Sequence, residues 1–312
     1  MAQEPRTLME AVRHFADPDV ALQHMVELRW GGKVTCPTCG RDDVRFIATR
    51  RLWECKEKHA RKQFSAKVGT IFEDSALPLD KWFVAIWMVA NCKNGISSYE
   101  MARALGITQK SAWHMNHRIR LAMRLGTIEK MDGHIEADET YVGGKAANRH
   151  KGDPRNGPGT HGKVAVIGAL QREGRAIAAV IKTADTPTLD SFVHAYVAPE
   201  ASVSTDEHSG YRHLGRTFKH GIVRHSAGEY VKGDHHTNSI EGFWALLKRS
   251  IKGTYISVEP FHLGRYVDEH TFRFNERKTD DGNRFRIALS GITGRRLTYK
   301  ELTRNGAIAS AA

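Results

Sequence analysis

The sequence predicts a multidomain chain with a small β module, an all-α segment and a larger α/β domain, in that order. Three observations predict it. Cysteines and aromatic residues crowd into residues 31–72, apolar positions at helical spacing fill residues 78–124, and strand-like runs alternate with helical runs after residue 130. With 312 residues and 40% hydrophobic content, the chain is long enough for such domains. Residues 1–30 are expected to form a helical lead-in.

Three cysteines and one histidine in the β module have the spacing of a zinc site. Cys36 and Cys39 form a Cys-x-x-Cys turn, and Cys55 and His59 follow after a further 15 residues. Four nitrogen or sulfur ligands suit tetrahedral zinc, and a filled set leaves no position for a reactive water. We therefore expect a structural zinc ribbon over residues 31–72. His59 stands where such ribbons usually have another cysteine, and the alternative is a set of reduced thiols without metal.

Residues 78–124 have the pattern of a helix-turn-helix. Ser97 or Ser98 can cap a first helix that ends at Gly106, and Thr108 can cap a second. Polar residues of the second helix are left for the outside, where a recognition helix meets base edges. A plain helical hairpin would give the same periodicity. The residues expected to contact DNA here are Gln109, Lys110, Ser111, His114 and Arg118.

The charge balance favours a polyanionic partner. The chain has 47 Lys and Arg against 35 Asp and Glu, a formal net charge of +12, and neutralising phosphates releases condensed counterions. Many soluble proteins are basic without binding nucleic acid, so charge alone does not distinguish a nucleic-acid-binding protein from an ordinary basic one. The N-terminus lacks a secretory signal, and the longest apolar run, residues 82–92, is about half a membrane span. We expect a cytoplasmic protein with no membrane partner.

The remainder of the chain predicts an α/β domain over residues 130–285. Two β-rich runs around a turn predict a hairpin over residues 163–183, and the later elements are a helix, a short strand at 201–206 and helices at 238–252 and 259–274. Residues 145–163 are rich in Gly, Pro and basic residues and are expected to form a surface loop able to hold a phosphate backbone. Residues 286–312 are left unassigned.

Three acids of this domain are candidate metal ligands. Asp138 lies in a strand-like run, Asp206 ends another, and Glu241 lies on the rim of a helix whose apolar stripe would pack on the sheet, two turns before Lys248. Together they can converge on Mg²⁺, which takes few protein carboxylates and keeps sites open for phosphate oxygens. Each acid alone would suit a cap or a surface charge equally well.

These motifs resemble the DDE transposases, and most closely the Merlin-related group of bacterial insertion sequences. The matching stretches are ADETYVGGK, TDEHSGY and HTNSIEGFWALLKRSIKGTY, preceded by CPTCG and the helix-turn-helix. The resemblance implies an RNase H-like fold with a mixed sheet and a triad of Asp138, Asp206 and Glu241 holding Mg²⁺ or Mn²⁺. It also implies that Lys248 approaches the phosphate backbone. Asn238 is the alternative third ligand, because parts of the group are described with Asn there.

The predicted function is therefore DNA transposition. Such an enzyme binds the terminal inverted repeats of its element, hydrolyses the phosphodiester at the element end and joins the freed 3′-hydroxyl to target DNA. Both ends must be cut together, so a homodimer or larger synaptic assembly is expected. The alternatives are a transcription regulator with an inactive RNase H-like domain, and a structure-selective nuclease of the same fold. In the catalytic domain, the residues expected to contact DNA are Lys248, Arg249 and Lys252.

Overall fold

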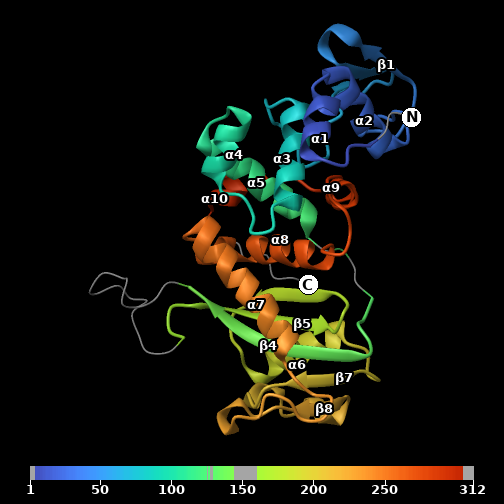
Figure 1. Ribbon diagram of the computed structural model, residues 1–312. Coiled ribbons are helices and arrows are strands. Elements are labelled where there is room, and N and C mark those ends of the chain that lie inside the picture. Colours follow the sequence, from blue (N-terminus) through green and yellow to red (C-terminus); the bar gives the residue numbers. More distant parts are fainter. Residues whose placement is uncertain (1–3, 125, 127–128, 144–159, 305–312) are drawn as a thin grey trace. The chain divides into compact units, whose positions relative to one another are not determined.

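The computed structural model describes residues 4–124, 126, 129–143 and 160–304. Within this part of the chain there are two compact units. The first comprises residues 4–124 together with 278–304, and the second comprises the described residues between 126 and 277. Each unit is described by itself below (Figure 1).

The first unit begins with the expected helical lead-in, α1 (Leu8–Phe15) and α2 (Pro18–Trp30). Thr7 and Asp17 cap the two helices through their side chains, and Gly31 ends α2 in the left-handed conformation. A three-stranded antiparallel sheet follows, in the order β1 (Val44–Ile47), β2 (Leu52–Cys55) and β3 (Gln63–Phe64). This sheet is the small β module that the sequence predicts.

Three helices come next: α3 (Leu79–Asn91), α4 (Ser98–Leu105) and α5 (Gln109–Met123). The expected caps are present. Ser97 and Glu100 form a reciprocal capping box on α4, Gly106 ends that helix with a positive φ, and Thr108 caps α5. The predicted helix-turn-helix residues therefore form two helices joined by a short turn.

The chain returns to the first unit at Lys278, earlier than the boundary at residue 285 that we expected. Helix α9 (Asp281–Ser290) packs on α3 and α5, and α10 (Tyr299–Thr303) follows it. The rings of Phe285 and Phe15 lie 5.8 Å apart, and Ile71 N donates to Ile292 O at 3.0 Å. Residues 286–304, for which the sequence indicated no role, complete this core.

The second unit is built on a mixed five-stranded sheet, as expected. Its strands are β4 (His134–Val142), β5 (Val164–Gln171), β6 (Ala176–Ile181), β7 (Ser202–Thr205) and β8 (Lys219–Ile222). The order is β6-β5-β4-β7-β8, with β6, β5 and β4 antiparallel and β4, β7 and β8 parallel. This arrangement is that of an RNase H-like domain. Residues 145–159 of the predicted basic loop lie outside the described residues.

Helices cover both faces of this sheet (Figure 1). One face packs on α6 (Thr186–Tyr196), and the other packs on α7 (Asn238–Ser250) and α8 (Leu263–Asn275). Side chains alternate along β4, so Ile135 and Ala137 face α6 while Val142 faces α7. The predicted apolar stripe of α7 is buried: Ile240, Phe243, Trp244, Leu247 and Ile251.

None of the helices in the described ranges is long and apolar enough to cross a lipid bilayer.

Candidate active site and zinc centre

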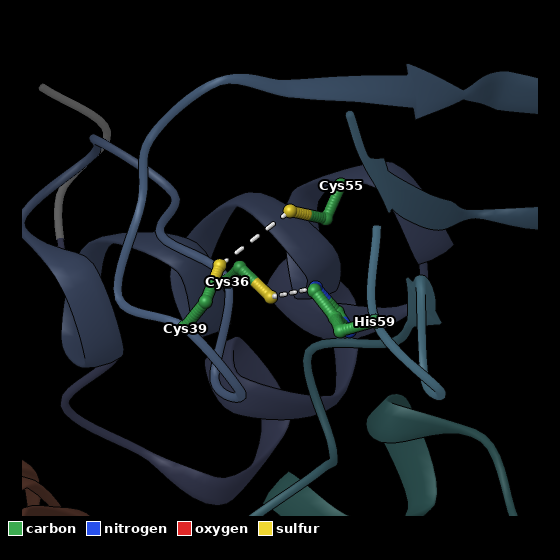
Figure 2. Close-up of side chains that lie close together, drawn as sticks. All are labelled: Cys36, Cys39, Cys55 and His59. Carbon is green, nitrogen blue, oxygen red and sulfur yellow. Dashed lines mark hydrogen bonds between the residues drawn. The ribbon is translucent and has the colours of Figure 1, made fainter. Parts of the chain in front are cut away.

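Cys36, Cys39, Cys55 and His59 come together beside the three-stranded sheet (Figure 2). Their ligand atoms all lie within 4.8 Å of one another. Two turns position them: Cys36 O accepts from Gly40 N at 2.8 Å, and Cys55 N donates to Lys62 O at 2.9 Å. Gly40 has a φ of 76°, which the tight turn after a Cys-x-x-Cys pair requires.

The spacing of these atoms fits a tetrahedral zinc ion. Cys39 Sγ and Cys55 Sγ are 3.6 Å apart, and Cys36 Sγ and His59 Nε2 are 3.5 Å apart. Zn–S bonds of about 2.3 Å at tetrahedral angles place two sulfurs about 3.7 Å apart. Across the ranges that the structure describes, no other group of His, Cys, Asp and Glu side chains is as closely gathered.

The basic residues of the ribbon have acidic neighbours. Arg45 pairs with Glu54 at 2.7 Å, and Arg51 of the ribbon pairs with Asp19 of α2 at 2.8 Å. Arg41 with Glu57 and Lys56 with Asp43 form similar exposed pairs. Exposed pairs contribute little to stability and exchange readily for another anion.

Helix α5 places the predicted DNA-contacting residues in different environments. Lys110 is exposed and its ammonium lies 4.7 Å from the ring centre of Tyr299, while Ser111 is half-buried. The amide of Gln109 donates to Ser98 Oγ at 2.8 Å. His114 is half-buried, with Nε2 3.2 Å from Leu297 O. The part of the predicted DNA-contacting face that is exposed is therefore limited to the first turn of α5.

Arg118 does not lie on the outer face that we expected. It is 5% exposed and donates to the backbone oxygen of Glu73. Burial lowers the pKa of its guanidinium. The physical reason is that α3, α4 and α9 all pack against α5, so the second half of this helix is enclosed on every side. Arg120, two residues further along the helix, is 2% exposed.

In the second unit, the register of two parallel strands brings Asp138 and Asp206 together. On β4 and β7, His134 pairs with Ser202 and Glu136 with Ser204. Extending this register by two residues sets Asp206 beside Asp138, and neighbouring strands lie about 4.8 Å apart. Backbone N–H of His208 donates to Asp206 Oδ1 at 2.9 Å, which fixes that side chain at the end of β7.

The environment of Asp138 suits a cation. Burial raises its pKa to about 7, and the charges of Glu139 and Asp206 add to this effect. Trp244 Nε1 of α7 donates to Asp138 Oδ2 at 3.0 Å. Burial lowers the pKa of Lys248 on the same helix, while the charge of Asp138 opposes that effect. Carboxylates crowded in this way are oxygen donors of the kind that Mg²⁺ and Mn²⁺ take.

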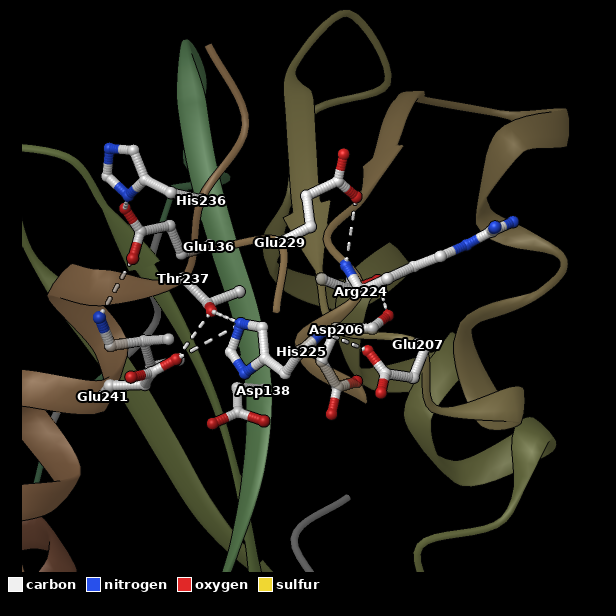
Figure 3. Close-up of polar contacts among 12 residues, drawn as sticks. Glu136, Asp138, Asp206, Glu207, Arg224, His225, Glu229, His236, Thr237 and Glu241 are labelled. Atoms are coloured by element: carbon white, nitrogen blue, oxygen red, sulfur yellow. Dashed lines mark hydrogen bonds and ion pairs between the residues drawn. The ribbon is translucent and has the colours of Figure 1, made fainter. Parts of the chain in front are cut away.

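Glu241 lies on the first turn of α7, turned toward the end of the sheet (Figure 3). Its Oε1 accepts from Thr237 Oγ1 at 2.9 Å and lies 3.7 Å from His225 Nε2. Figure 3 shows the ring of His225 drawn between Glu241 and the two aspartates. Asn238, the alternative third ligand, is exposed at the start of α7, and Arg249 and Lys252 are exposed near its end.

Comparison with known proteins matches two parts of this chain. Residues 130–275 match the ISXO2-like transposase domain, and residues 17–61 match the transposase zinc-ribbon domain. Residues 130–275 are therefore similar to an ISXO2-like transposase domain. It is also 25% identical, over 256 residues, to an uncharacterized protein in the transposable element ISH50 of Halobacterium salinarum. That match covers 77% of this chain and 85% of the relative.

These matches confirm the resemblance to DDE transposases and support a transposase. The matched zinc-ribbon domain contains all four members of the Cys₃His cluster, which supports structural zinc. The transposase domain match ends at residue 275, close to Lys278, where the chain returns to the first unit.

The transposase domain holds further site residues that the sequence did not indicate. His225 is held by Glu207, whose carboxylate accepts from His225 N at 2.7 Å and Ser226 N at 3.0 Å. Tyr211 donates its hydroxyl to Glu139 at 2.9 Å, and burial raises the pKa of Glu139. Glu139 and Glu207 could have been identified from the sequence, because they directly follow Asp138 and Asp206. No sequence feature pointed to His225.

Three further histidines, His208, His235 and His236, lie near these acids in different places. His208 Nε2 lies 3.7 Å from Glu139 Oε1, so His208 borders the aspartates. His235 Nδ1 is 2.9 Å from Ser204 Oγ, and His236 Nδ1 is 3.1 Å from Glu136 Oε1. His235 and His236 therefore contact residues that precede the candidate ligands on β7 and β4.

Proposed function

We propose that this chain is a DNA transposase that hydrolyses the phosphodiester at each end of its element and joins the freed 3′-hydroxyl to target DNA. The observation that supports it most is the β4–β7 register, which would set Asp206 beside Asp138 if continued by two residues, in a segment that matches the ISXO2-like transposase domain. Helix α7 crosses the same face of the sheet and carries Glu241 and Lys248.

In this proposal Asp138, Asp206 and Glu241 hold Mg²⁺ or Mn²⁺, with Asn238 as the alternative third ligand. When bound, such ions supply charge neutralisation for the attacking and leaving oxygens of an in-line phosphoryl transfer. Lys248 contributes a cation beside Asp138, where the phosphate backbone would pass. Trp244 orients Asp138 through its indole N–H. Arg249 and Lys252, exposed near the end of α7, would contact DNA beyond the scissile bond.

The partner in this proposal is double-stranded DNA, bound at the element ends by the zinc ribbon and the helix-turn-helix. Lys110 and Ser111 in the first turn of α5, with Gln109 and His114 beside them, would contact the duplex in this proposal. Because two ends are processed together, the working form would be a homodimer or a larger synaptic assembly. The place of action would be the cytoplasm, where the element's DNA lies.

The test is strand transfer in vitro with purified protein, Mg²⁺ or Mn²⁺, a plasmid target and a labelled duplex from the sequence flanking the gene. We expect joined product from wild type and none from Asp206→Asn or Glu241→Gln. Glu200→Gln, an exposed acid in the turn before β7, is the matched control and should join normally.

Other outcomes point elsewhere. Joining that survives Glu241→Gln but fails in Asn238→Ala would move the third ligand to Asn238. Cleavage without joining would favour a nuclease of the same fold. Sequence-specific binding with neither cleavage nor joining, under both metals, would favour the transcription regulator.

A further inference from the structure

Glu136 is a buried carboxylate that the proposed reaction does not use. Its side chain is fully buried on β4, two residues before Asp138 and on the same face of the strand. Four groups donate hydrogen bonds to it. They are Ser239 N at 2.8 Å, Ile240 N at 3.0 Å, Ser239 Oγ at 3.0 Å and Arg172 Nε at 2.9 Å.

These contacts replace a cap that α7 lacks. Thr237, at the N-cap position, accepts no hydrogen bond from the backbone N–H groups of the first turn, and its hydroxyl donates to the Glu241 side chain instead. The first backbone N–H groups of a helix need acceptors, and a negative charge there is favoured by the helix dipole. Glu136, on a strand about 100 residues earlier in the chain, supplies both the hydrogen-bond acceptors and the negative charge. The start of α7 is thus fastened to β4 itself.

A second contact fixes the same helix further along. Trp244 Nε1 donates to Asp138 Oδ2, so α7 meets β4 at residue pairs 239–136 and 244–138. Two residues of strand span about 6.6 Å and five residues of helix about 7.5 Å, so the two contacts are compatible in length. Gly168, opposite Asp138 on β5, leaves room for the Trp244 ring, since a Cβ there would lie 2.7 Å from it.

Glu241 lies between these two contacts on the helix. We propose that Glu136 is a positioning residue, which sets the register of α7 on β4 so that Glu241 and Lys248 are presented at Asp138. This inference rests on the proposed metal-dependent strand transfer, because Glu241 and Lys248 need to lie near Asp138 only if they act together in that reaction. Glu136 itself touches neither substrate nor metal in this role.

Arg172 completes the arrangement. Besides pairing with Glu136, its guanidinium donates to Asp234 O at 2.6 Å and to His236 O at 3.3 Å. These carbonyls belong to the segment that leads into α7. Arg172 therefore offsets the buried charge of Glu136 and holds the approach to the helix with the same side chain.

Glu136→Gln tests the proposal sharply. A carboxylate only accepts hydrogen bonds, and each of its oxygens accepts from an N–H group: Arg172 Nε at Oε1, and Ser239 N and Ile240 N at Oε2. The amide nitrogen of Gln must therefore face an N–H donor in either orientation. We expect amide exchange in residues 237–244 to accelerate by about tenfold or more, as charge-assisted hydrogen bonds are lost. We also expect half-maximal strand transfer to require several times more Mn²⁺, with partial recovery at saturation.

Val193→Ala is the matched control, since Val193 is a buried residue of α6, which covers the opposite face of the sheet. It should lower the melting temperature without changing exchange in α7 or the Mn²⁺ midpoint. Wild-type exchange and a wild-type midpoint in Glu136→Gln would overturn the proposal, as would equal changes in Val193→Ala.

Should Glu136→Gln fail to fold, the double variant Glu136→Gln, Arg172→Gln removes the buried pair together, which proteins tolerate better than losing one partner. The same expectations apply to it. If wild type shows no cleavage or joining, the proposed function fails by itself. Exchange in residues 237–244 then still decides whether Glu136 fixes α7 to the sheet.

Discussion

Asp138 combines a hydrogen bond from Trp244 with a pKa that burial and two neighbouring acids raise to about 7. Folding raises this pKa above its ordinary 3.8, so the folded protein binds the proton more tightly than the unfolded chain does. The contribution of Asp138 to folding stability is therefore most favourable below about pH 4 and is lost as the pH rises to about 7. A bound divalent cation would remove this penalty.

We predict that Asp138→Asn stabilises the metal-free protein at pH 8, by up to about 4 kcal/mol as an upper limit for a shift of about three pKa units. The amide oxygen of Asn can still accept from Trp244. Thermal unfolding at pH 8 and pH 5 measures the effect, which should shrink at the lower pH. Excess Mg²⁺ should stabilise wild type but not the variant.

A variant no more stable than wild type at pH 8, and equally responsive to Mg²⁺, would contradict this view of the site. Glu200→Gln again serves as the control, because Glu200 is an exposed acid of the same unit and should change neither quantity.

At the residue scale, the sequence predicted the acids but not what holds them. Asp138, Asp206 and Glu241 were predicted because they stand in a strand-like run, at the end of a strand and on the rim of an apolar stripe, within recognisable motifs. Glu136 was noted only as a neighbouring acid, and His225 was not noted. Their roles depend on partners far away in the chain, Ser239 and Glu241, and no local spacing reports such contacts.

Among the elements, the zinc ribbon depends most on a few side chains. Its strands are two to four residues long, too short to be stable without the Cys₃His cluster. Cys36, Cys39 and Cys55 lie in strands and turns that hold them near His59. This ribbon differs from the usual pattern in its fourth ligand position, where His59 stands in place of a cysteine.

We predict that His59→Cys keeps one zinc per chain, because a thiolate is an equally good ligand for tetrahedral zinc. His59→Ala should lose zinc and make residues 33–64 sensitive to protease, while the second unit stays resistant. Metal analysis and limited proteolysis measure the two effects. Full zinc content in His59→Ala would mean that the fourth ligand lies elsewhere.

Helix α5 separates two kinds of residue that the sequence could not tell apart. Lys110 and Arg118 are both basic and both were expected outside, yet only Lys110 is exposed. Periodicity identified one buried stripe, of Ala112, Met115 and Ile119. It could not indicate that α9, from the far end of the chain, encloses the other side. The predicted helices were therefore right and the predicted outer face was too wide.

We predict that Lys110→Ala weakens binding to element-end DNA by about 1–3 kcal/mol and leaves the melting temperature unchanged. Arg118→Ala should instead lower the melting temperature, because it removes a buried guanidinium and leaves Glu73 O without that donor. Fluorescence anisotropy with a labelled end duplex and thermal unfolding measure the two effects. Arg118→Ala that weakens DNA binding while remaining fully stable would contradict the assignment.

For the whole molecule, the main difference from the sequence prediction is that the first unit is discontinuous. The chain leaves it at Arg124, forms the transposase domain, and returns at Lys278. The boundary expected at residue 285 falls inside α9, a helix that the sequence did not indicate. Which core a helix joins depends on partners such as Phe15 and Trp87, which lie about 270 and about 200 residues before Phe285 and which no local pattern identifies.

We predict that Phe285→Ala lowers the unfolding free energy of the first unit by about 3–5 kcal/mol, the usual cost of removing a buried phenyl ring. Phe285 is 3% exposed, and its ring lies 5.1 Å from that of Trp87 and 5.8 Å from that of Phe15. Ile287→Ala is the control on the same helix, since Ile287 is 40% exposed. Hydrogen exchange resolved by segment should show faster opening of residues 8–30 and 79–91 in Phe285→Ala, with residues 134–275 unchanged. If exchange accelerated across 134–275 instead, α9 would belong to the transposase domain, and the boundary at residue 285 would stand.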